Sequence, residues 1–255
     1  MKILDCNLSY GISIDGIPYR NCNTFAELCD KMKSAGMDGG LIRCSLTSTA
    51  GVVFGNQRLA DDLAAAKDCG LQLWGVWGLV PPHTGETPAP EKLAEEMAKN
   101  NIAALYLDPG SHHFMTNKVS MGKYFAVAQE RRIPIILSNR FGVSVEQICD
   151  ILENFPKLTV ILYTTDSWPN GRRLYPIAAE FENVYVDMSH IMDDQGVEDL
   201  CKRFGEDHVL FGSAFPDRYA GSQMANVRTA MIREDVRAKV FGGNLERLIG
   251  MEDLK

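Results

Sequence analysis

The chain has 255 residues, of which 45% are hydrophobic and 23% charged, so it can bury a large core and is not an intrinsically disordered protein. Its formal net charge of -7 argues against binding nucleic acid or an anionic membrane through bulk positive charge. The N-terminal MKILDCNLSYG is too short and too polar for a signal peptide, and no window approaches the roughly 18 uninterrupted apolar residues of a membrane span.

Short apolar runs recur along the chain and predict eight strands. They are Lys2–Cys6, Gly39–Cys44, Leu71–Trp77, Ile102–Leu107, Ile133–Leu137, Leu158–Tyr163, Val184–Met188 and His208–Phe211. The runs lack the strict alternation of a half-exposed antiparallel sheet. Continuous apolar runs are typical of parallel strands that are covered on both faces.

Helical patterns lie between these runs. One follows Thr24, where Thr24 and Glu27 form a capping-box signature and Gly36 a stop signal. Further patterns are expected over Gln57–Cys69, Ser144–Phe155 and Gly196–Phe204, each with apolar residues at three-to-four spacing.

The order of strand and helix, repeated eight times, predicts a single (β/α)8 TIM barrel over residues 1–255, closed by C-terminal helices. A doubly wound open sheet is the alternative. The turn after the first strand, residues 7–16, has no GxGxxG, which weakens a dinucleotide-binding version of that alternative.

In a TIM barrel the functional residues lie where the strands end, so the polar residues at these places are candidates. They are Asp5, Asn7 and Ser9 after the first run, Arg43 and Ser45 after the second, and Trp74 and Trp77 at the third. The later ends carry Asp108, Ser111, His112 and His113; Ser138, Asn139 and Arg140; Thr164, Thr165 and Asp166; Asp187, Ser189 and His190; and Ser213, Ala214, Asp217 and Arg218.

Several of these segments resemble the amidohydrolase-related family, which comprises TIM-barrel metal-dependent hydrolases and decarboxylases. The residues that carry the resemblance are ILDCNLS at the start, NVYVDMSH, VLFGSAFP and VFGGNLERLIGM. The resemblance spans the chain but is sharp only at these points. It implies the barrel fold and hydrolase or lyase chemistry on a small molecule.

The departures from the family pattern concern its metal centre. The resemblance implies His-x-His on the first strand, His on the fifth and sixth strands, and Asp on the eighth. This chain has Asn7 and Ser9, Ser138, Thr164 and Ala214 at those positions. Zinc sites use imidazole, thiolate or carboxylate ligands. We therefore expect no metal or other cofactor, a divalent ion being conceivable only at a relocated site.

Arginines at two strand ends indicate a binding site for an anion. Arg43 and Arg140 suit a small carboxylate through bidentate hydrogen bonds, and the resemblance points the same way, because some family members hydrolyse lactones of dicarboxylic acids without metal. The alternative is that each arginine forms a structural ion pair with Asp5, Asp108, Asp166 or Asp217. Further candidates for substrate binding are Asn7, Ser9, Trp77, Asn139 and Thr164, with Trp77 and Phe141 as apolar walls.

Histidines and carboxylates near the strand ends are candidates for proton transfer. Asp108, His112, His113, His190 and Asp217 are the proposed catalytic residues, because His and Asp together can act as general base and acid. The alternatives are a hydrogen-bonded loop pair or a relocated metal site. Asp5 and Asp187 are interpreted as structural, and the seven scattered cysteines as buried thiols in a reducing cytoplasm.

Three functions stay open from the sequence. The first is a hydrolase or lyase that acts without the usual metal centre on a small carboxylated molecule. The second is a pseudoenzyme that binds a ligand or partner without turnover, and the third a hydrolase with a relocated metal. We expect no nucleic-acid or membrane partner. A homodimer is one of the oligomeric states that the sequence leaves open.

Overall fold

The computed structural model describes residues 1–12, 22–163 and 167–250, with the backbone alone for residues 167–170. Eight parallel strands form one sheet in the order of the sequence. They are β1 (Leu4–Tyr10), β2 (Gly39–Cys44), β3 (Gln72–Leu79), β4 (Ile102–Leu107), β5 (Ile135–Leu137), β6 (Val160–Tyr163), β7 (Val184–Asp187) and β8 (Val209–Leu210). The predicted order of strands is confirmed.

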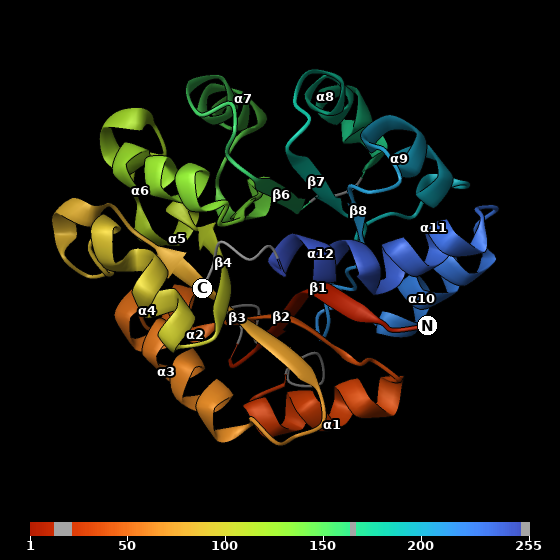
Figure 1. Ribbon diagram of the computed structural model, residues 1–255, viewed down its shortest axis with the longest axis horizontal. Coiled ribbons are helices and arrows are strands. Elements are labelled where there is room, and N and C mark those ends of the chain that lie inside the picture. The colour runs from red at the N-terminus through yellow and green to blue at the C-terminus, as the bar shows by residue number, and fades with distance from the viewer. Residues whose placement is uncertain (13–21, 164–166, 251–255) are drawn as a thin grey trace.

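Helices surround the sheet, as Figure 1 shows. The α-helices are α1 (Phe25–Ala35), α2 (Leu46–Thr49), α3 (Val52–Ala65), α4 (Leu93–Lys99), α5 (Pro109–His112), α6 (Lys118–Arg131), α7 (Val145–Asn154), α8 (Ser167–Glu180), α9 (Gly196–Phe204), α10 (Ala220–Thr229), α11 (Glu234–Ala238) and α12 (Asn244–Ile249). Short 3-10 turns are η2 (Pro82–Thr84), η3 (Pro90–Lys92) and η4 (Asn139–Phe141), and η5 (Lys239–Gly243) is a π-turn.

The sheet closes between its first and last strands. The Cys6 amide donates to the Phe211 carbonyl oxygen at 2.8 Å, and the Ser9 amide to that of Phe215 at 3.0 Å. These bonds close the TIM barrel, so the open-sheet alternative is wrong. Strand β1 continues to Tyr10, beyond the predicted end at Cys6, because residues 8–10 pair with β2 on one side and Leu8 bridges to Phe215 on the other. Asn7 therefore lies within the strand.

Helix ends largely follow the sequence signals. The Thr24 side chain accepts from the Glu27 amide at 3.2 Å, and Gly36 ends α1 with a positive φ of 77°. The Glu27 carboxylate, however, accepts from the Asn23 amide and not from Thr24, so the capping box is only half formed. Helix α3 starts at Val52, whereas the sequence pattern predicted a start at Gln57.

The core has two layers. The outer layer joins strands to the surrounding helices, whereas the inner one consists of strand residues such as Leu41 and Ile136 together with Leu245 and Leu248 of α12. Helix α12 lies across one end of the barrel (Figure 1) and packs against β1 and β8. Because this end is filled by α12, the opposite end, where the strands finish, is left for the site.

None of the described helices combines the length and apolar character that a membrane span requires.

Candidate active site

A cavity of about 270 Å³ opens where the strands end. Its walls come from β1, β2, β4 and β6, from α2 and α5, and from the segments after β5, β7 and β8, and most of its side chains are polar. The lining residues are Asn7, Ser9, Tyr10, Gly11, Arg43, Cys44, Ser45, Ser48, Thr49, Tyr106, Asp108, Ser111, Ser138, Arg140, Phe141, Tyr163, His190, Ala214, Pro216 and Asp217. The cavity therefore gathers side chains that are far apart in the sequence.

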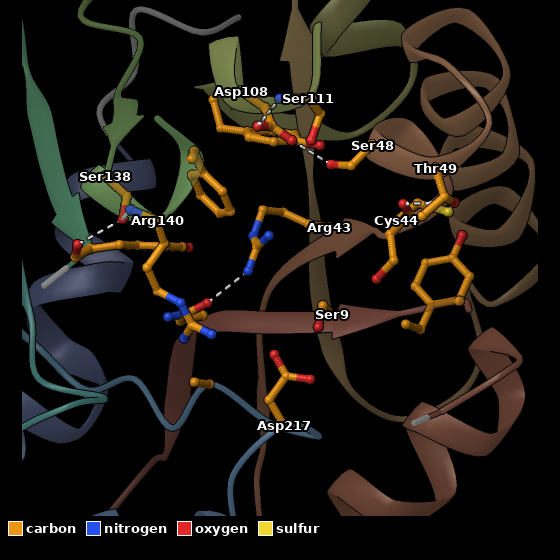
Figure 2. Close-up of a pocket in the computed structure, with 18 of the residues that line it drawn as sticks. Ser9, Arg43, Cys44, Ser48, Thr49, Asp108, Ser111, Ser138, Arg140 and Asp217 are labelled. Atoms are coloured by element: carbon orange, nitrogen blue, oxygen red, sulfur yellow. Dashed lines mark hydrogen bonds between the residues drawn. The ribbon is translucent and has the colours of Figure 1, made fainter. Parts of the chain in front are cut away.

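Arg43 reaches from β2 into the middle of the cavity (Figure 2). Three aromatic rings surround its guanidinium group: the Cζ atom lies 4.9 Å from the ring centre of Phe141, 5.5 Å from Tyr163 and 5.7 Å from Tyr106. Its Nη2 donates to Asn7 Oδ1 at 2.9 Å, whereas its buried Nε has no partner in the described structure. Rings at these distances attract a cation and restrict its movement.

Asn7 connects Arg43 to a buried carboxylate. Its Oδ1 accepts from Arg43, and its Nδ2 donates to Asp187 Oδ2 at 3.0 Å and to Ser189 Oγ at 3.1 Å. An amide has one acceptor end and one donor end, so these partners fix its orientation. Asp187 is fully buried, and its burial raises its pKa, while hydrogen bonds from Ser189 and Asn7 act in the opposite direction.

A second arginine approaches the cavity from the turn after β5. Arg140 Nη1 lies 2.7 Å from His190 Nε2. The turn is held by Ser138, whose Oγ accepts from the Arg140 amide at 3.2 Å and donates to the Tyr163 carbonyl oxygen at 3.0 Å. Because Arg140 is exposed on a 3-10 turn, its side chain has more freedom than that of Arg43.

Two carboxylates face the cavity from different sides. Asp108 accepts from Ser48 Oγ at 2.5 Å and from the Ser111 amide at 3.1 Å, so hydroxyl and amide groups compensate for its burial. Asp217 is exposed and, in Figure 2, lies with Arg140 on the opposite side of Arg43 from Asp108. Of these two carboxylates, that of Asp217 is the one exposed to solvent.

Asp5 lies next to the cavity and connects two segments of its wall by hydrogen bonds. It is fully buried and accepts from the Asn7 amide at 2.8 Å, from the Ser213 amide at 3.2 Å and from Ser213 Oγ at 2.5 Å. Burial raises the pKa of Asp5 to about 7. These bonds join β1 to the chain after β8, which agrees with the structural role expected for Asp5.

The structure brings together most of the predicted site residues. The cavity wall includes Asn7, Ser9, Arg43, Asp108, Arg140, His190 and Asp217, together with Phe141. Neither Arg43 nor Arg140 forms an ion pair with a described carboxylate, so the structural ion pairs considered for them with Asp5, Asp108 and Asp217 do not occur. Thr164 lies outside the described residues.

Four predicted residues lie elsewhere. Trp77 packs in the outer core layer and donates from Nε1 to the Asn56 carbonyl oxygen at 3.2 Å, because the inward position of β3 is Val76. Asn139 is exposed and faces a separate smaller cavity beside α7. Asp108 caps α5, which carries His112 and His113 out of the cavity lining. The structure therefore places these four outside the lining of the main cavity.

Sequence reasoning missed several wall residues. Tyr106 and Tyr163 appear as members of apolar strands, yet their side chains point into the barrel beside Arg43. A tyrosine near the carboxyl end of an otherwise apolar strand would have been the signal, because its hydroxyl group needs a polar partner. Ser48, on the short helix α2, had no such signal, and Ser189 was noted at a strand end without a role.

A sequence model of the amidohydrolase family matches residues 27–251. The chain belongs to the amidohydrolase family. Comparison of this amidohydrolase-family chain with curated proteins gave no match.

Solved structures share its fold. A TIM-barrel protein from Bordetella bronchiseptica has a TM-score of 0.73 at 19% identity, with 98% of this chain and 99% of that chain covered. The 5-carboxyvanillate decarboxylase of Sphingomonas paucimobilis gives 0.71 at 15%, covering 98% and 99%. A dihydroxybenzoic acid decarboxylase from Polaromonas, solved with bound manganese and 2-nitroresorcinol, gives 0.70 at 15%, covering 98% and 97%.

The donor set at the strand ends of this amidohydrolase-family chain does not fit a metal centre of the kind that the resemblance implies. Asn7, Ser9 and Ser138 offer neutral oxygen atoms, and Ala214, which has a positive φ of 54°, offers none. Among residues 1–12, 22–163 and 167–250, no group of three or more His, Cys, Asp or Glu side chains is placed to hold a metal ion. Zinc centres use imidazole, thiolate or carboxylate ligands, and the side chains at these positions supply none of them.

Proposed function

We propose that the chain is a hydrolase or lyase that binds a small carboxylated molecule through Arg43 and Arg140 and acts on it without a metal ion on the strand ends. The observation that carries this proposal is that the two arginines have no counter-charge among the described residues. Both line the cavity, and within the described structure neither has a carboxylate partner. Arg43 is a partly buried cation, and such a cation is stabilised by a counter-charge, which a bound anion would supply.

The shape of the cavity supports a small ligand. Its volume of about 270 Å³ is slightly below the range of about 300 to 1,000 Å³ that is usual for drug-sized ligands. Arg43 has a planar group with an unpartnered buried Nε, so its fork can form paired hydrogen bonds with one carboxylate. The rings of Phe141 and Tyr163 next to it give the same region an apolar surface. A small acid with an unsaturated or aromatic body matches both features.

Acid–base groups stand close to this anion site. His190 contacts Arg140 directly, and Asp217 is an exposed carboxylate at the cavity wall. Either group can accept or return a proton during hydrolysis or loss of carbon dioxide. Asp108 is already bound by Ser48 and Ser111, which fits a structural role better than proton transfer. The decarboxylases among the structural neighbours support the choice of hydrolase or lyase chemistry.

Calorimetric titration with small carboxylates tests the proposal. The panel contains benzoate, succinate and a hydroxybenzoate, each paired with its neutral amide, and inorganic phosphate as a different anion. We expect saturable binding of a carboxylate, no binding of its amide, and loss of binding in the double variant Arg43→Met/Arg140→Met. Equal binding by the double variant would refute the anion site.

Turnover and metal content are then measured on the same preparation. Product formation from the carboxylates that bind is followed by NMR, with and without a chelator. Chelator-resistant turnover supports the metal-independent reaction, whereas activity proportional to a bound ion would point to a relocated metal. Binding without turnover of any panel member favours the pseudoenzyme, an alternative supported by the mutual hydrogen bond of Arg140 and His190.

We also propose a cytoplasmic location. All seven cysteines are free thiols, and five of them are buried. Such thiols are typical of proteins in reducing compartments.

A further inference from the structure

His190 has a hydrogen-bonding partner at each of its two ring nitrogens, and these contacts indicate where its proton sits. Its Nε2 is 2.7 Å from Arg140 Nη1, and its Nδ1 is 2.8 Å from Ser189 Oγ. A guanidinium group only donates hydrogen bonds, so Nε2 has to accept with its lone pair. A neutral imidazole has one hydrogen on nitrogen, which must then be on Nδ1.

The other end of the chain of hydrogen bonds agrees with this assignment. Ser189 Oγ lies 2.5 Å from Asp187 Oδ2 and also accepts from Asn7 Nδ2 at 3.1 Å. A hydroxyl has a single hydrogen and two lone pairs. If it accepts from Asn7 and from His190 Nδ1, its hydrogen points to the Asp187 carboxylate. Asp187 Oδ1 in turn accepts from the Ser189 amide at 2.9 Å, so the carboxylate accepts from both hydrogen-bond donors of Ser189.

The reverse arrangement has to be considered, because burial raises the pKa of Asp187. In that arrangement a protonated Asp187 donates to Ser189, and Ser189 donates to His190 Nδ1. The hydrogen of the neutral ring would then be on Nε2, facing an N–H group of Arg140 across 2.7 Å. Two donors do not form a hydrogen bond, so the contact with Arg140 excludes this arrangement.

We propose that Ser189, held by the Asp187 carboxylate, is a positioning residue that keeps His190 in the Nδ1–H tautomer and so makes Nε2 the hydrogen-bond acceptor at the cavity wall. Arg140 occupies that acceptor in the free protein. Resting on the proposed function, an anion that attracts Arg140 would expose Nε2 to an acidic proton of the ligand. His190 would thus be a base that becomes available when the ligand binds.

NMR of protein labelled with ¹⁵N on histidine tests the tautomer directly. The spectra are recorded at about pH 8, above the ordinary histidine pKa of about 6.5, so that a ring with an ordinary pKa is neutral. We expect His190 to show a protonated Nδ1 and an Nε2 with lone-pair character. A protonated Nε2, in a neutral or a charged ring, would overturn the proposal.

Variants of Ser189 separate positioning from simple packing. In Ser189→Ala the Nδ1–H group loses its acceptor, and we expect both tautomers to be populated, so that the two nitrogen shifts move toward each other. Ser189→Thr keeps a hydroxyl and should restore the separation. His208, which contacts the ring of Tyr185 just before β8, is the internal control and should not change. An unchanged His190 spectrum in Ser189→Ala would show that Ser189 has no positioning role.

The same samples distinguish failure of this inference from failure of the proposed function. The tautomer is measured in the free protein, so it is decided whether or not a ligand binds. Addition of a carboxylate that binds should then shift the His190 signals. If no carboxylate binds, the proposed function fails, while an Nδ1–H tautomer that depends on Ser189 would still support the positioning role.

Discussion

The cavity has two walls that are built differently. The deep wall consists of Arg43 and Asn7 with the rings of Tyr106, Phe141 and Tyr163, and apart from Phe141 these side chains stand on strands. The rim wall consists of Arg140, His190 and Asp217, which stand on a 3-10 turn and on the segments after β7 and β8.

This difference separates two tasks. Barrel register and ring packing fix the direction of Arg43, so little side-chain entropy is lost when an anion binds there. In the rim wall, the positions depend on hydrogen bonds between side chains, which a ligand can replace. The deep wall therefore suits affinity, and the rim wall suits proton transfer and exchange of ligand.

Asp5→Asn should have the largest effect of these variants, and the quantity it changes is the pH dependence of folding stability. Asp5 lies beside the deep wall, where it accepts hydrogen bonds from Asn7 and Ser213. With its pKa raised to about 7, folded Asp5 keeps a proton that the unfolded chain releases near pH 4. Between about pH 4 and 7, stability of the wild type therefore falls as pH rises, by up to about 1.4 kcal/mol per pH unit, and the contribution levels off above pH 7.

Asn at position 5 does not titrate, and its amide can keep the bonds to Asn7 and Ser213, so the slope should become shallower. Asp187 contributes in the same direction because its pKa is also raised, so some slope should remain. Urea unfolding at several pH values measures the effect. Identical slopes in variant and wild type would mean that Asp5 does not carry this proton.

Arg43→Met should weaken carboxylate binding about 100-fold, because it removes a paired, charge-assisted hydrogen-bonding group worth about 3 kcal/mol. Arg43→Lys is the matched control: it keeps the charge but loses the planar fork, and we expect an intermediate loss of about 10-fold. Calorimetry supplies both numbers. A larger loss in Arg140→Met than in Arg43→Met would reverse the comparison of the two walls.

Arg140→Met should weaken binding about 10-fold, because this exposed cation is screened by solvent and has to leave His190 to bind an anion. The loss should shrink as salt is added, whereas that of Arg43→Met should change less. Titrations at low and high ionic strength test this contrast, and equal salt dependence for both variants would argue against a deep and a rim wall.

Asp217→Asn should have the smallest effect on affinity and the opposite sign. Removing an exposed negative charge near the anion site should strengthen carboxylate binding about two- to threefold at low salt. If Asp217 is instead the proton carrier, turnover falls in the same variant while binding stays intact. Weaker binding would indicate that the Asp217 carboxylate accepts a hydrogen bond from the ligand or orders another group that binds it.

Much of the barrel follows from the sequence, because each strand is a local apolar run and each helix has local capping or stop signals. The positions that departed from expectation depended on contacts distant in sequence. Strand β1 extends to Tyr10 because residues 8–10 pair with Ile42–Cys44 of β2 on one side and contact Phe215 after β8 on the other, and no local pattern in residues 7–10 indicates these neighbours.

The sequence by itself also determined which chemical groups stand at the strand ends, including the neutral side chains of Asn7, Ser9 and Ser138. Only the tertiary structure decided which of them meet. Side chains alternate across a strand, so one position separates Trp77 in the outer core from Val76 in the barrel interior. Likewise the contact of Arg140 with His190, fifty positions apart, exists only because the turns after β5 and β7 meet at one end of a closed barrel.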